Sequence, residues 1–403
     1  MASPDDPSPA RPRSRRLLLL AMTALVTVAL VTACAESSGD DGGAREVERR
    51  YRLYHGADPV PDVAPGTLLR YQAIDTTIPE AQAWRILYAS EGSDGERIAV
   101  SGMVVAPDLI PPARGFPVVA WAHPTAGTAD QCAPSKEGPG TIIGARLLVQ
   151  DGFLVAATDY EGLGTPGVHP YLDGVSAGNA LIDAARAAAG LPGVDTAPAT
   201  LFWGYSQGGQ AAVFAAQQAA DHAPDLDVRG TVAAAPAAGI RRLAGGQDGR
   251  PPLPGVALMM LGTWSVDRDL DAAAILGDEA AALVPRLEET CEPNPLVADL
   301  SQPLVVEPPA VDVEPWSDLL VQSTPGRSAA AGPVLLVQGQ RDRIVAPAST
   351  DRLFRRLCRT GSTVELRRFA ERGHGVAIFA RHEIELWLDH RRQGLEARDE
   401  CAG

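Results

Sequence analysis

The sequence predicts an α/β fold in which a mostly parallel central sheet is flanked by helices. Short apolar runs rich in β-branched residues alternate with alanine-rich helical stretches from about residue 98 onward. Hydrophobic residues make up 45% of the 403 residues, which is enough for a large core. The alternation is interrupted by one proline-containing stretch, residues 237–332, that is far longer than an ordinary connection. These observations indicate one core with an insertion.

The predicted strands and helices follow one another along the core. The strands are Ile98–Val105, Pro117–Ala122, Phe153–Thr158, Thr200–Trp203, Gly230–Ala235, Val334–Gln338 and Val364–Phe369. The helices are Thr141–Gln150, Asn179–Ala189, Gln207–Ala220, Ala348–Arg359 and Val376–His390, with Asp269–Leu276 and Asp278–Glu288 in the insertion. Because the insertion lies between two core strands, we expect residues 51–236 and 333–403 to form the core and residues 237–332 to form a mainly helical lid.

The N-terminus has the pattern of an export signal. Four arginines between residues 11 and 16 precede the uncharged run Leu17–Ala33. The run ends in Val31-Thr32-Ala33-Cys34, which resembles a bacterial lipobox, in which Cys34 is lipidated and becomes the mature N-terminus. A plain membrane anchor is the alternative, although the run is near the lower length limit for spanning. We therefore expect a signal peptide over 1–33, a flexible tether over 34–50 and an exported lipoprotein, anchored to the outer face of the cell membrane or released.

Charge and cysteine content narrow the classes of partner and cofactor. A net charge of −15 argues against a nucleic-acid partner, because phosphate binding needs a basic face. The sequence has no CxxC, no HExxH and no cysteine–histidine cluster, so we expect no metal site. In an oxidising compartment the four remaining cysteines allow three disulfide pairings: Cys132, Cys291, Cys358 and Cys401. Nothing in the sequence indicates the oligomeric state.

The motif GxSxG occurs twice, at Gly174–Gly178 and at Gly204–Gly208. In a nucleophile elbow this motif joins a buried strand to a helix, so that the serine hydroxyl projects at the helix N-terminus. Ser206 has an expected strand before it and an expected helix after it. Ser176 follows residues that are typical of a loop. We therefore predict Ser206 as a nucleophile and interpret Ser176 as a helix N-cap or turn residue.

A serine nucleophile needs a histidine base and an acid that orients the histidine. Asp342 directly follows one of the last two predicted strands and His374 follows the other, so both lie at strand C-terminal ends, where parallel sheets carry their chemistry. Asp159 is the competing acid, although its main interpretation is to hold its own loop. His169 is either a pocket residue or part of loop packing. The remaining histidines fall in helices or near the N-terminus and are interpreted as surface or capping residues.

Two backbone amides must stabilise the oxyanion of an acyl-transfer intermediate. Gln207, which follows the predicted nucleophile, supplies the first. The loop after the strand Pro117–Ala122 supplies the second. Pro124 in this loop has no N–H, so we predict Thr125 as the donor.

Together these residues resemble the secretory lipase family of α/β-hydrolases in its actinobacterial, lipoprotein-type form. The resemblance implies an α/β-hydrolase fold with a helical lid, the triad of Ser206, Asp342 and His374, and hydrolysis of carboxylic esters, including acylglycerols, without metal or cofactor. It also implies the disulfides Cys132–Cys291 and Cys358–Cys401. Pro124 is its main departure. The matching segments are Trp121–His123, Ala126-Gly127, Cys132–Ser135, Asp159–Gly164, His169–Leu172, Gly204–Gly209, Gly339–Asp342 and Gly373-His374.

Two other functions remain open at the level of sequence. An acyltransferase would use the same triad with an alcohol in place of water. A catalytically silent binding lipoprotein would keep the fold and lose the activity, with Pro124 as its sign. The apolar stretch Val256–Leu261 in the insertion is either a wall for an acyl chain or the core of the lid.

Overall fold

A computed structural model describes residues 52–55, 59–245, 253–306, 312 and 314–401. The predicted signal peptide, the lipobox cysteine Cys34 and the tether lie outside these residues. Within the described residues, no helix has both the length and the apolar character needed to cross a membrane.

In the described part of the chain, nine strands form one sheet with the order β1-β2-β3-β5-β4-β6-β7-β8-β9. From β5 to β9 neighbouring strands are parallel, whereas β1, β2 and β3 pair antiparallel with each other and β3 pairs antiparallel with β5. This mostly parallel sheet confirms the predicted fold class. The strands are β1 (Leu68–Ile74), β2 (Ala81–Glu91), β3 (Arg97–Pro107), β4 (Phe116–Ala122), β5 (Leu154–Thr158), β6 (Thr196–Tyr205), β7 (Asp227–Ala234), β8 (Val334–Gly339) and β9 (Val364–Phe369).

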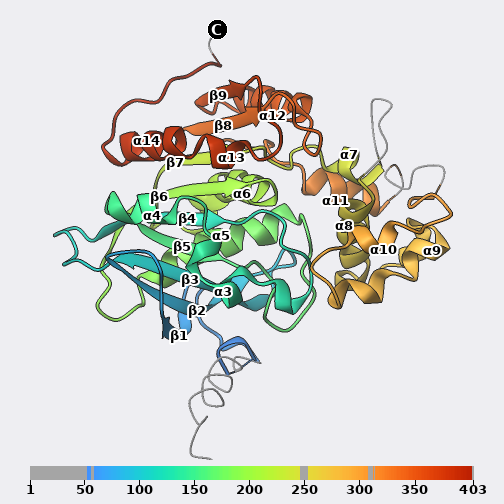
Figure 1. The fold of residues 1–403 in the computed structure, drawn as a ribbon, viewed down its shortest axis with the longest axis horizontal. Helices are drawn as coiled ribbons and strands as arrows, with labels where there is room; N and C mark the ends of the chain where they lie inside the picture. The colour runs from blue at the N-terminus through green and yellow to red at the C-terminus, as the bar shows by residue number, and fades with distance from the viewer. Residues whose placement is uncertain (1–51, 56–58, 246–252, 307–311, 313, 402–403) are drawn as a thin grey trace, which may run out of the picture. The chain divides into compact units, whose positions relative to one another are not determined.

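Helices cover both faces of the sheet (Figure 1). On one face lie α5 (Gly174–Ala188), α6 (Gln207–His222) and α12 (Pro347–Arg359). On the other face lie α4 (Ala145–Gln150), α13 (Val376–Phe379) and α14 (Arg381–Arg392). Between β4 and α4 the chain forms the short helices η1 (Asp130–Cys132), α3 (Pro134–Glu137) and η2 (Pro139–Thr141).

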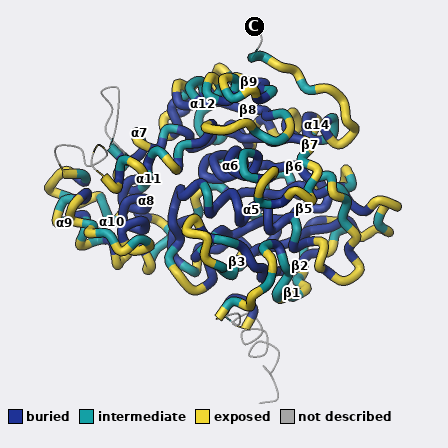
Figure 2. Tube along the Cα trace, turned by 180° about the vertical axis from the view of Figure 1, so that it is seen from behind, coloured by how far each residue is buried: buried dark blue, intermediate teal, exposed yellow. Residues whose placement is uncertain are grey.

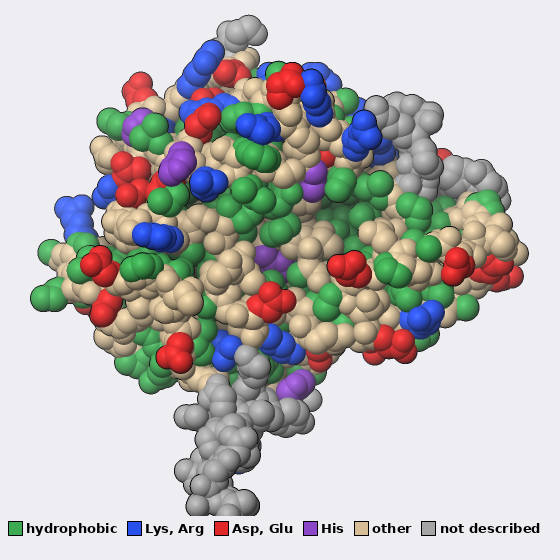
Figure 3. Space-filling view, viewed as in Figure 1, with side chains coloured by type: hydrophobic (Ala, Val, Ile, Leu, Met, Phe, Trp, Pro, Cys, Tyr) green, Lys and Arg blue, Asp and Glu red, His purple; other side chains and the backbone are tan. Residues whose placement is uncertain are grey.

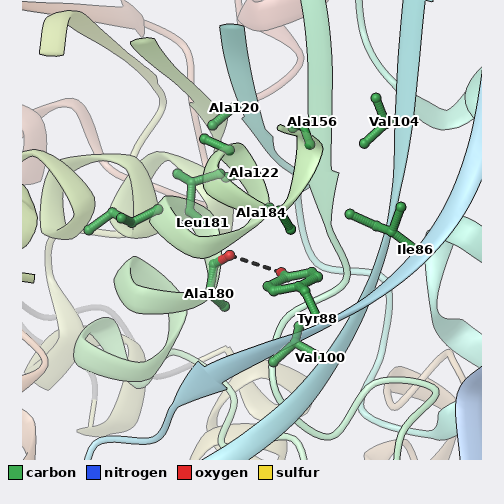
Figure 4. Packing of buried hydrophobic residues seen from close by; sticks show 14 of the residues in the cluster. Ile86, Tyr88, Val100, Val104, Ala120, Ala122, Ala156, Ala180, Leu181 and Ala184 are labelled. Carbon is green, nitrogen blue, oxygen red and sulfur yellow. Dashed lines mark hydrogen bonds between the residues drawn. The ribbon is translucent and has the colours of Figure 1, made fainter. Parts of the chain in front are cut away.

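The central strands are buried on both faces, which is why they appear in the sequence as continuous apolar runs. Every residue of β5 and β8 is buried, and Figure 2 shows the strands and the helices next to them in the colour of buried residues. Figure 4 shows how small side chains of α5, β4 and β5 pack around Tyr88 of β2. The Tyr88 hydroxyl donates to the carbonyl of Ala180 at 2.9 Å, which links the antiparallel edge to helix α5.

Of the predicted core helices, Gln207–Ala220 and Ala348–Arg359 agree with α6 and α12 within two residues, and the other three differ more. The helix predicted over Thr141–Gln150 begins only at Ala145, as α4, because Gly144 before it has a left-handed backbone (φ 80°). The helix predicted to start at Asn179 starts at Gly174, because the Asp173 side chain accepts hydrogen bonds from two amides of its first turn. The C-terminal helix is divided at Ala380 into α13 and α14.

Residues 237–332 contain short helices with a hydrophobic cluster of their own, which also includes Tyr171 and Leu172 of a core loop. The apolar stretch in α8 is buried in this cluster, with Ala257–Leu261 at most 2% exposed, so these residues form its core. The predicted helix 278–288 is divided, because Pro285 lacks an N–H. The helices are α7 (Ile240–Gly245), α8 (Pro254–Asp267), η3 (Ala272–Ala274), α9 (Asp278–Ala281), η4 (Val284–Glu288), α10 (Asn294–Val297) and α11 (Trp316–Gln322).

Covalent and ionic contacts connect this helical segment to the core. The disulfide Cys132–Cys291 joins η1 to the segment, with 5.5 Å between the Cα atoms. Arg268, at the end of α8, forms an ion pair with the buried Asp173 and donates to Ser93 Oγ at 3.0 Å. The second disulfide, Cys358–Cys401, joins the end of α12 to the C-terminal tail. Both disulfides implied by the resemblance are therefore present in the structure, whereas the division of the chain into core and lid stays a prediction.

Candidate active site

Ser206 lies on a sharp turn between strand β6 and helix α6. Its backbone has φ 60° and ψ −112°, a conformation that a non-glycine residue rarely adopts. The turn is held in place because the Ser206 amide donates to the Ala234 carbonyl of β7 at 2.9 Å. Such a strained strand-to-helix turn is the geometry of a nucleophile elbow.

The glycines on either side of Ser206 allow the close approach of backbone that this turn requires. A Cβ atom on Gly204 would lie 1.9 Å from the Gly208 carbonyl oxygen, and one on Gly208 would lie 1.9 Å from the Ala122 carbonyl oxygen at the end of β4. Neither contact is tolerable, so only glycine fits at both positions.

The structure brings Ser206 together with His374 and Asp342. The three residues follow three different strands: Ser206 follows β6, Asp342 follows β8 and His374 follows β9. His374 Nε2 lies 3.0 Å from Ser206 Oγ, and His374 Nδ1 lies 2.8 Å from Asp342 Oδ2. In this arrangement the serine hydroxyl donates to Nε2 and the Nδ1–H donates to the carboxylate. The Asp342 side chain is buried, whereas 18% of the His374 side chain is exposed.

Asp342 is held by donors around both carboxylate oxygens. The amides of Ile344 and Val345 each donate to Oδ1 at 2.9 Å, and Gln338 Nε2 donates to Oδ2 at 3.2 Å. The Gln338 amide oxygen in turn accepts from Thr350 Oγ1 at 2.6 Å. Sequence reasoning missed Gln338, because a glutamine at the end of a buried strand has no motif of its own.

Gln207 and Thr125 lie on the two segments predicted to supply oxyanion donors. Gln207 is the first residue of α6, so its amide has no acceptor within the helix. The loop before Thr125 is fixed by a hydrogen bond from the Tyr160 hydroxyl to the His123 carbonyl at 2.8 Å. Thr125 Oγ1 lies 2.6 Å from the Tyr171 hydroxyl.

His169 is a buried residue that connects to the nucleophile turn through Gln207. Its Nδ1 donates to the Glu161 carbonyl at 2.8 Å, which leaves Nε2 to accept from Gln207 Nε2 at 2.9 Å. Burial lowers the pKa of His169 to about 3, so the ring stays neutral and keeps this tautomer. Of the two interpretations left open by the sequence, the structure combines loop packing with a contact to the site.

Ser176 and Asp159 lie apart from the triad in hydrogen-bond networks of their own. Ser176 is in the first turn of α5, where Asp173 is the N-cap, so the interpretation of Ser176 as the N-cap is wrong. Its hydroxyl donates to the Glu161 carboxylate. Asp159 is fully buried and accepts from Ser101 Oγ at 2.7 Å and from the Ser135 amide at 2.9 Å, so it holds loops together.

The helical segment and the core enclose a cavity, which none of the triad residues lines. The cavity, of about 280 Å³, lies between Thr128–Gln131 of the core, Gly262 and Val266 of α8, and Leu287 of η4. Figure 3 shows hydrophobic side chains around a hollow between the core and the helices α8–α11. Among the described residues, no group of three or more histidine, cysteine or carboxylate side chains could hold a metal ion.

Comparison with protein families agrees with the geometry of the site. The model of the family described as "Secretory lipase" matches residues 141–295, which include Ser206 and most of the helical segment. A model of the prolyl oligopeptidase family matches residues 316–391, which include Asp342 and His374.

Two curated proteins are similar over most of the chain. A probable inactive lipase of Mycobacterium tuberculosis is 26% identical over 316 residues, which cover 72% of this chain and 70% of the relative. Lipase A of Arthroderma benhamiae is 24% identical over 389 residues, which cover 84% of this chain and 78% of the relative.

Solved structures show the same fold. Candida antarctica lipase A has a TM-score of 0.70 at 20% identity and covers 85% of each chain. The rice cell wall degrading esterase LipA from Xanthomonas oryzae has a TM-score of 0.67 at 20% identity, covering 83% of this chain and 99% of the esterase. The secretory family match and the two disulfides indicate an exported protein.

Proposed function

We propose that this chain, a carboxylic ester hydrolase that belongs to the secretory lipase family, cleaves its substrate through an acyl-enzyme on Ser206. The observation that carries the proposal is the hydrogen-bonded series from Ser206 Oγ through His374 to Asp342, with distances of 3.0 and 2.8 Å. The substrate class is a carboxylic ester, including the acylglycerols that relatives named as lipases suggest.

The geometry supports a two-step reaction. In the first step Ser206 Oγ attacks the ester carbonyl carbon while His374 Nε2 accepts the hydroxyl proton, and the same proton then passes to the departing alkoxide. In the second step His374 takes a proton from water, the resulting hydroxide attacks the acyl carbon, and the proton returns to Ser206. Asp342 holds the Nδ1–H tautomer and stabilises the imidazolium that forms in each step.

The oxyanion is stabilised by backbone amides of Gln207 and Thr125. Gln207 is buried, and its amide lies at the positive N-terminal end of α6. The helix fixes the direction of this amide, so the amide needs no rearrangement during the reaction. The contact between the Gln207 side chain and His169 supports this role, because it fixes the residue that carries the amide. His169 is thus a positioning residue. Pro124 lacks an N–H, so the second amide comes from the residue that follows it.

The remaining parts of the proposal concern access and location. Residues 237–332 act as a lid over the core and are joined to it by Cys132–Cys291. Figure 3 shows a hollow between the two. Export depends on the signal in residues 1–33, and lipidation of Cys34 tethers the protein to the outer face of the membrane through residues 34–50.

Labelling with a fluorophosphonate tests the nucleophile directly. We expect the purified wild-type protein to react and the labelled peptide to carry the probe on Ser206. A series of p-nitrophenyl esters of increasing chain length then measures the acyl preference, and an added alcohol measures acyl transfer as opposed to hydrolysis. A folded wild-type protein that neither reacts nor hydrolyses any ester would support the catalytically silent binding lipoprotein.

A further inference from the structure

Three exposed large hydrophobic side chains lie close in sequence to the acid and the histidine of the triad. Ile344, which follows Asp342, is 45% exposed. Ile378 and Phe379, at the end of the short helix after His374, are 50% and 58% exposed. Exposed apolar side chains that occur singly need no explanation, but a group of them beside a site calls for one.

A backbone contact places the segments that carry these side chains next to one another. The Arg341 amide donates to the Arg372 carbonyl at 2.8 Å, so the loop that carries Ile344 runs beside the loop that leads into α13. The Arg372 guanidinium lies over the ring of Phe379, 3.9 Å from its centre. Arg381 Nη1 donates to the Ile378 carbonyl at 3.1 Å.

The same surface is basic in a chain whose net charge is −15. Arg372 and Arg381 contact residues of α13, Arg341 and Arg343 lie in the loop that carries Ile344, and Arg341 pairs with Glu371. Within the described part of the chain, Arg343 and Arg372 form no salt bridge with a carboxylate, and Arg381 interacts electrostatically with Glu385 without a close salt bridge. We call the surface made by Ile344, Ile378, Phe379 and these four arginines the α13 patch. Figure 3 shows hydrophobic and basic side chains next to one another over α13.

We propose that the α13 patch docks this enzyme onto an anionic lipid surface. Apolar side chains that project from a short helix can enter the boundary between headgroups and acyl chains, while arginines beside them remain at the level of the phosphates. The positive charge of the patch complements an anionic surface, whereas the negative charge of the whole chain would repel it.

Docking at this position would place the triad next to the lipid surface, because Asp342 and His374 are on the loops that carry the patch. This inference rests on the proposed function for its biological meaning, since the ester would be delivered from the lipid side. The binding itself does not depend on catalysis, so the two proposals can fail separately.

Vesicle sedimentation tests the patch. The protein is the mature chain from residue 34, with Cys34→Ala to remove the lipid and Ser206→Ala to prevent hydrolysis. Vesicles are made of phosphatidylcholine alone or of an equimolar mixture with phosphatidylglycerol. We expect binding to the mixed vesicles and a preference for them over the neutral ones.

Two pairs of substitutions separate the two components of the patch. Ile378→Ser with Phe379→Ser should weaken binding to mixed vesicles by about tenfold or more, because the inserted apolar area is lost. Arg343→Gln with Arg381→Gln should weaken binding to mixed vesicles by about 25-fold, at about fivefold per arginine, and remove the preference over neutral ones.

A matched control lies in the loop between β3 and β4, which contains the exposed Leu109 (65%) and Ile110 (94%). This loop lies at the opposite end of the strands from the triad. β3 pairs antiparallel with β5, so the C-terminal end of β3 lies beside the N-terminal end of β5, whereas the triad residues follow the C-terminal ends of their strands. Leu109→Ser with Ile110→Ser, and separately Arg114→Gln, should leave binding unchanged. In a background with Ser206 restored, the patch variants should hydrolyse a soluble short-chain ester at the wild-type rate.

Three results would overturn the proposal. The first is equal vesicle binding by the parent and by both patch variants. The second is an effect of the control loop as large as that of the patch. The third is a dimer in light scattering that Ile378→Ser with Phe379→Ser dissociates, because the patch would then be an interface between two copies. Loss of soluble-ester hydrolysis by the unmodified enzyme would count against the proposed function and leave the vesicle result standing.

Discussion

The two GxSxG segments have the same spacing and opposite structural roles. In Gly204–Gly208 the glycines let the backbone of a strand, a turn and a helix approach one another, and Ser206 projects toward His374. In Gly174–Gly178 the glycines lie inside helix α5, where Cβ atoms would meet side chains of α6, and Ser176 bonds to a carboxylate. The motif alone therefore indicates close packing, and the strand before it decides whether a nucleophile results.

Replacing each serine gives the largest expected contrast. Ser206→Ala should lower kcat for a soluble ester by about 10⁴-fold or more, because the acyl-enzyme cannot form. Ser176→Ala should leave kcat within about twofold, since its hydroxyl contacts Glu161 and not His374. Steady-state kinetics on both variants checks this, and comparable losses at the two positions would contradict the assignment.

Replacing the acidic residue associated with each serine should give a smaller contrast. This residue is Asp342 for Ser206 and Asp173 for Ser176. Asp342→Asn should lower kcat by about 10³- to 10⁴-fold, because the amide favours the wrong tautomer of His374. Asp173→Asn keeps an oxygen that can cap α5 but removes the ion pair with Arg268, so the free energy of unfolding should fall by about 1–2 kcal/mol.

Kinetics at saturating substrate, together with urea denaturation, separates these two effects. An Asp173→Asn variant with normal stability and a large loss of kcat would show that the α5 segment takes part in the reaction.

The glycines distinguish a severe backbone contact from a milder one. Gly204→Ala would bring a Cβ to 1.9 Å from a carbonyl oxygen, so we expect the elbow to be lost together with fluorophosphonate labelling. Gly178→Ala would bring a Cβ to 2.5 Å from Gln218 Oε1, which can move, and to 3.0 Å from the Ala215 amide nitrogen, so that α5 and α6 must separate slightly. The variant should lose about 1–3 kcal/mol of stability and keep its rate per labelled site. Denaturation curves and active-site titration measure both quantities.

A pH-dependent effect concerns Glu161, the partner of Ser176. Burial raises the pKa of Glu161 from 4.5 to about 7, despite the hydrogen bond from Ser176. Between these values the folded state keeps a proton that the unfolded state has lost. The contribution of this group to stability is therefore full below pH 4.5 and is lost as the pH rises through 7, by up to about 3 kcal/mol.

Glu161→Gln tests this pH dependence, because an amide does not titrate. Thermal unfolding at pH 5 and pH 8 should show a smaller decrease in the variant than in the wild type, with exposed Glu137→Gln as the control. An unchanged decrease in Glu161→Gln would mean that other groups cause it.

Much of the fold was accessible to sequence reasoning because the central strands are buried on both faces. All seven predicted strands are present, and most of them are short apolar runs. The strands β1 and β2 were missed. Charged and polar residues interrupt them. Arg85 in β2 is accommodated by contacts across the fold, which include its donation to the Ser135 carbonyl at 2.8 Å, fifty residues away in sequence.

The sequence by itself indicated Ser206, Asp342 and His374, because each follows a recognisable strand and such strand ends meet at one edge of a parallel sheet. Local residue patterns also predicted the insertion and the alternation of elements.

Only the tertiary structure decided which groups support these residues. The contact of Gln338 with Asp342 and that of His169 with Gln207 join residues whose partners are set by folding, and neither glutamine nor a buried histidine has a local signal. The α13 patch likewise depends on two loops that meet beside the triad. Periodicity reports burial along one segment, whereas contacts between segments depend on the packing of the whole sheet.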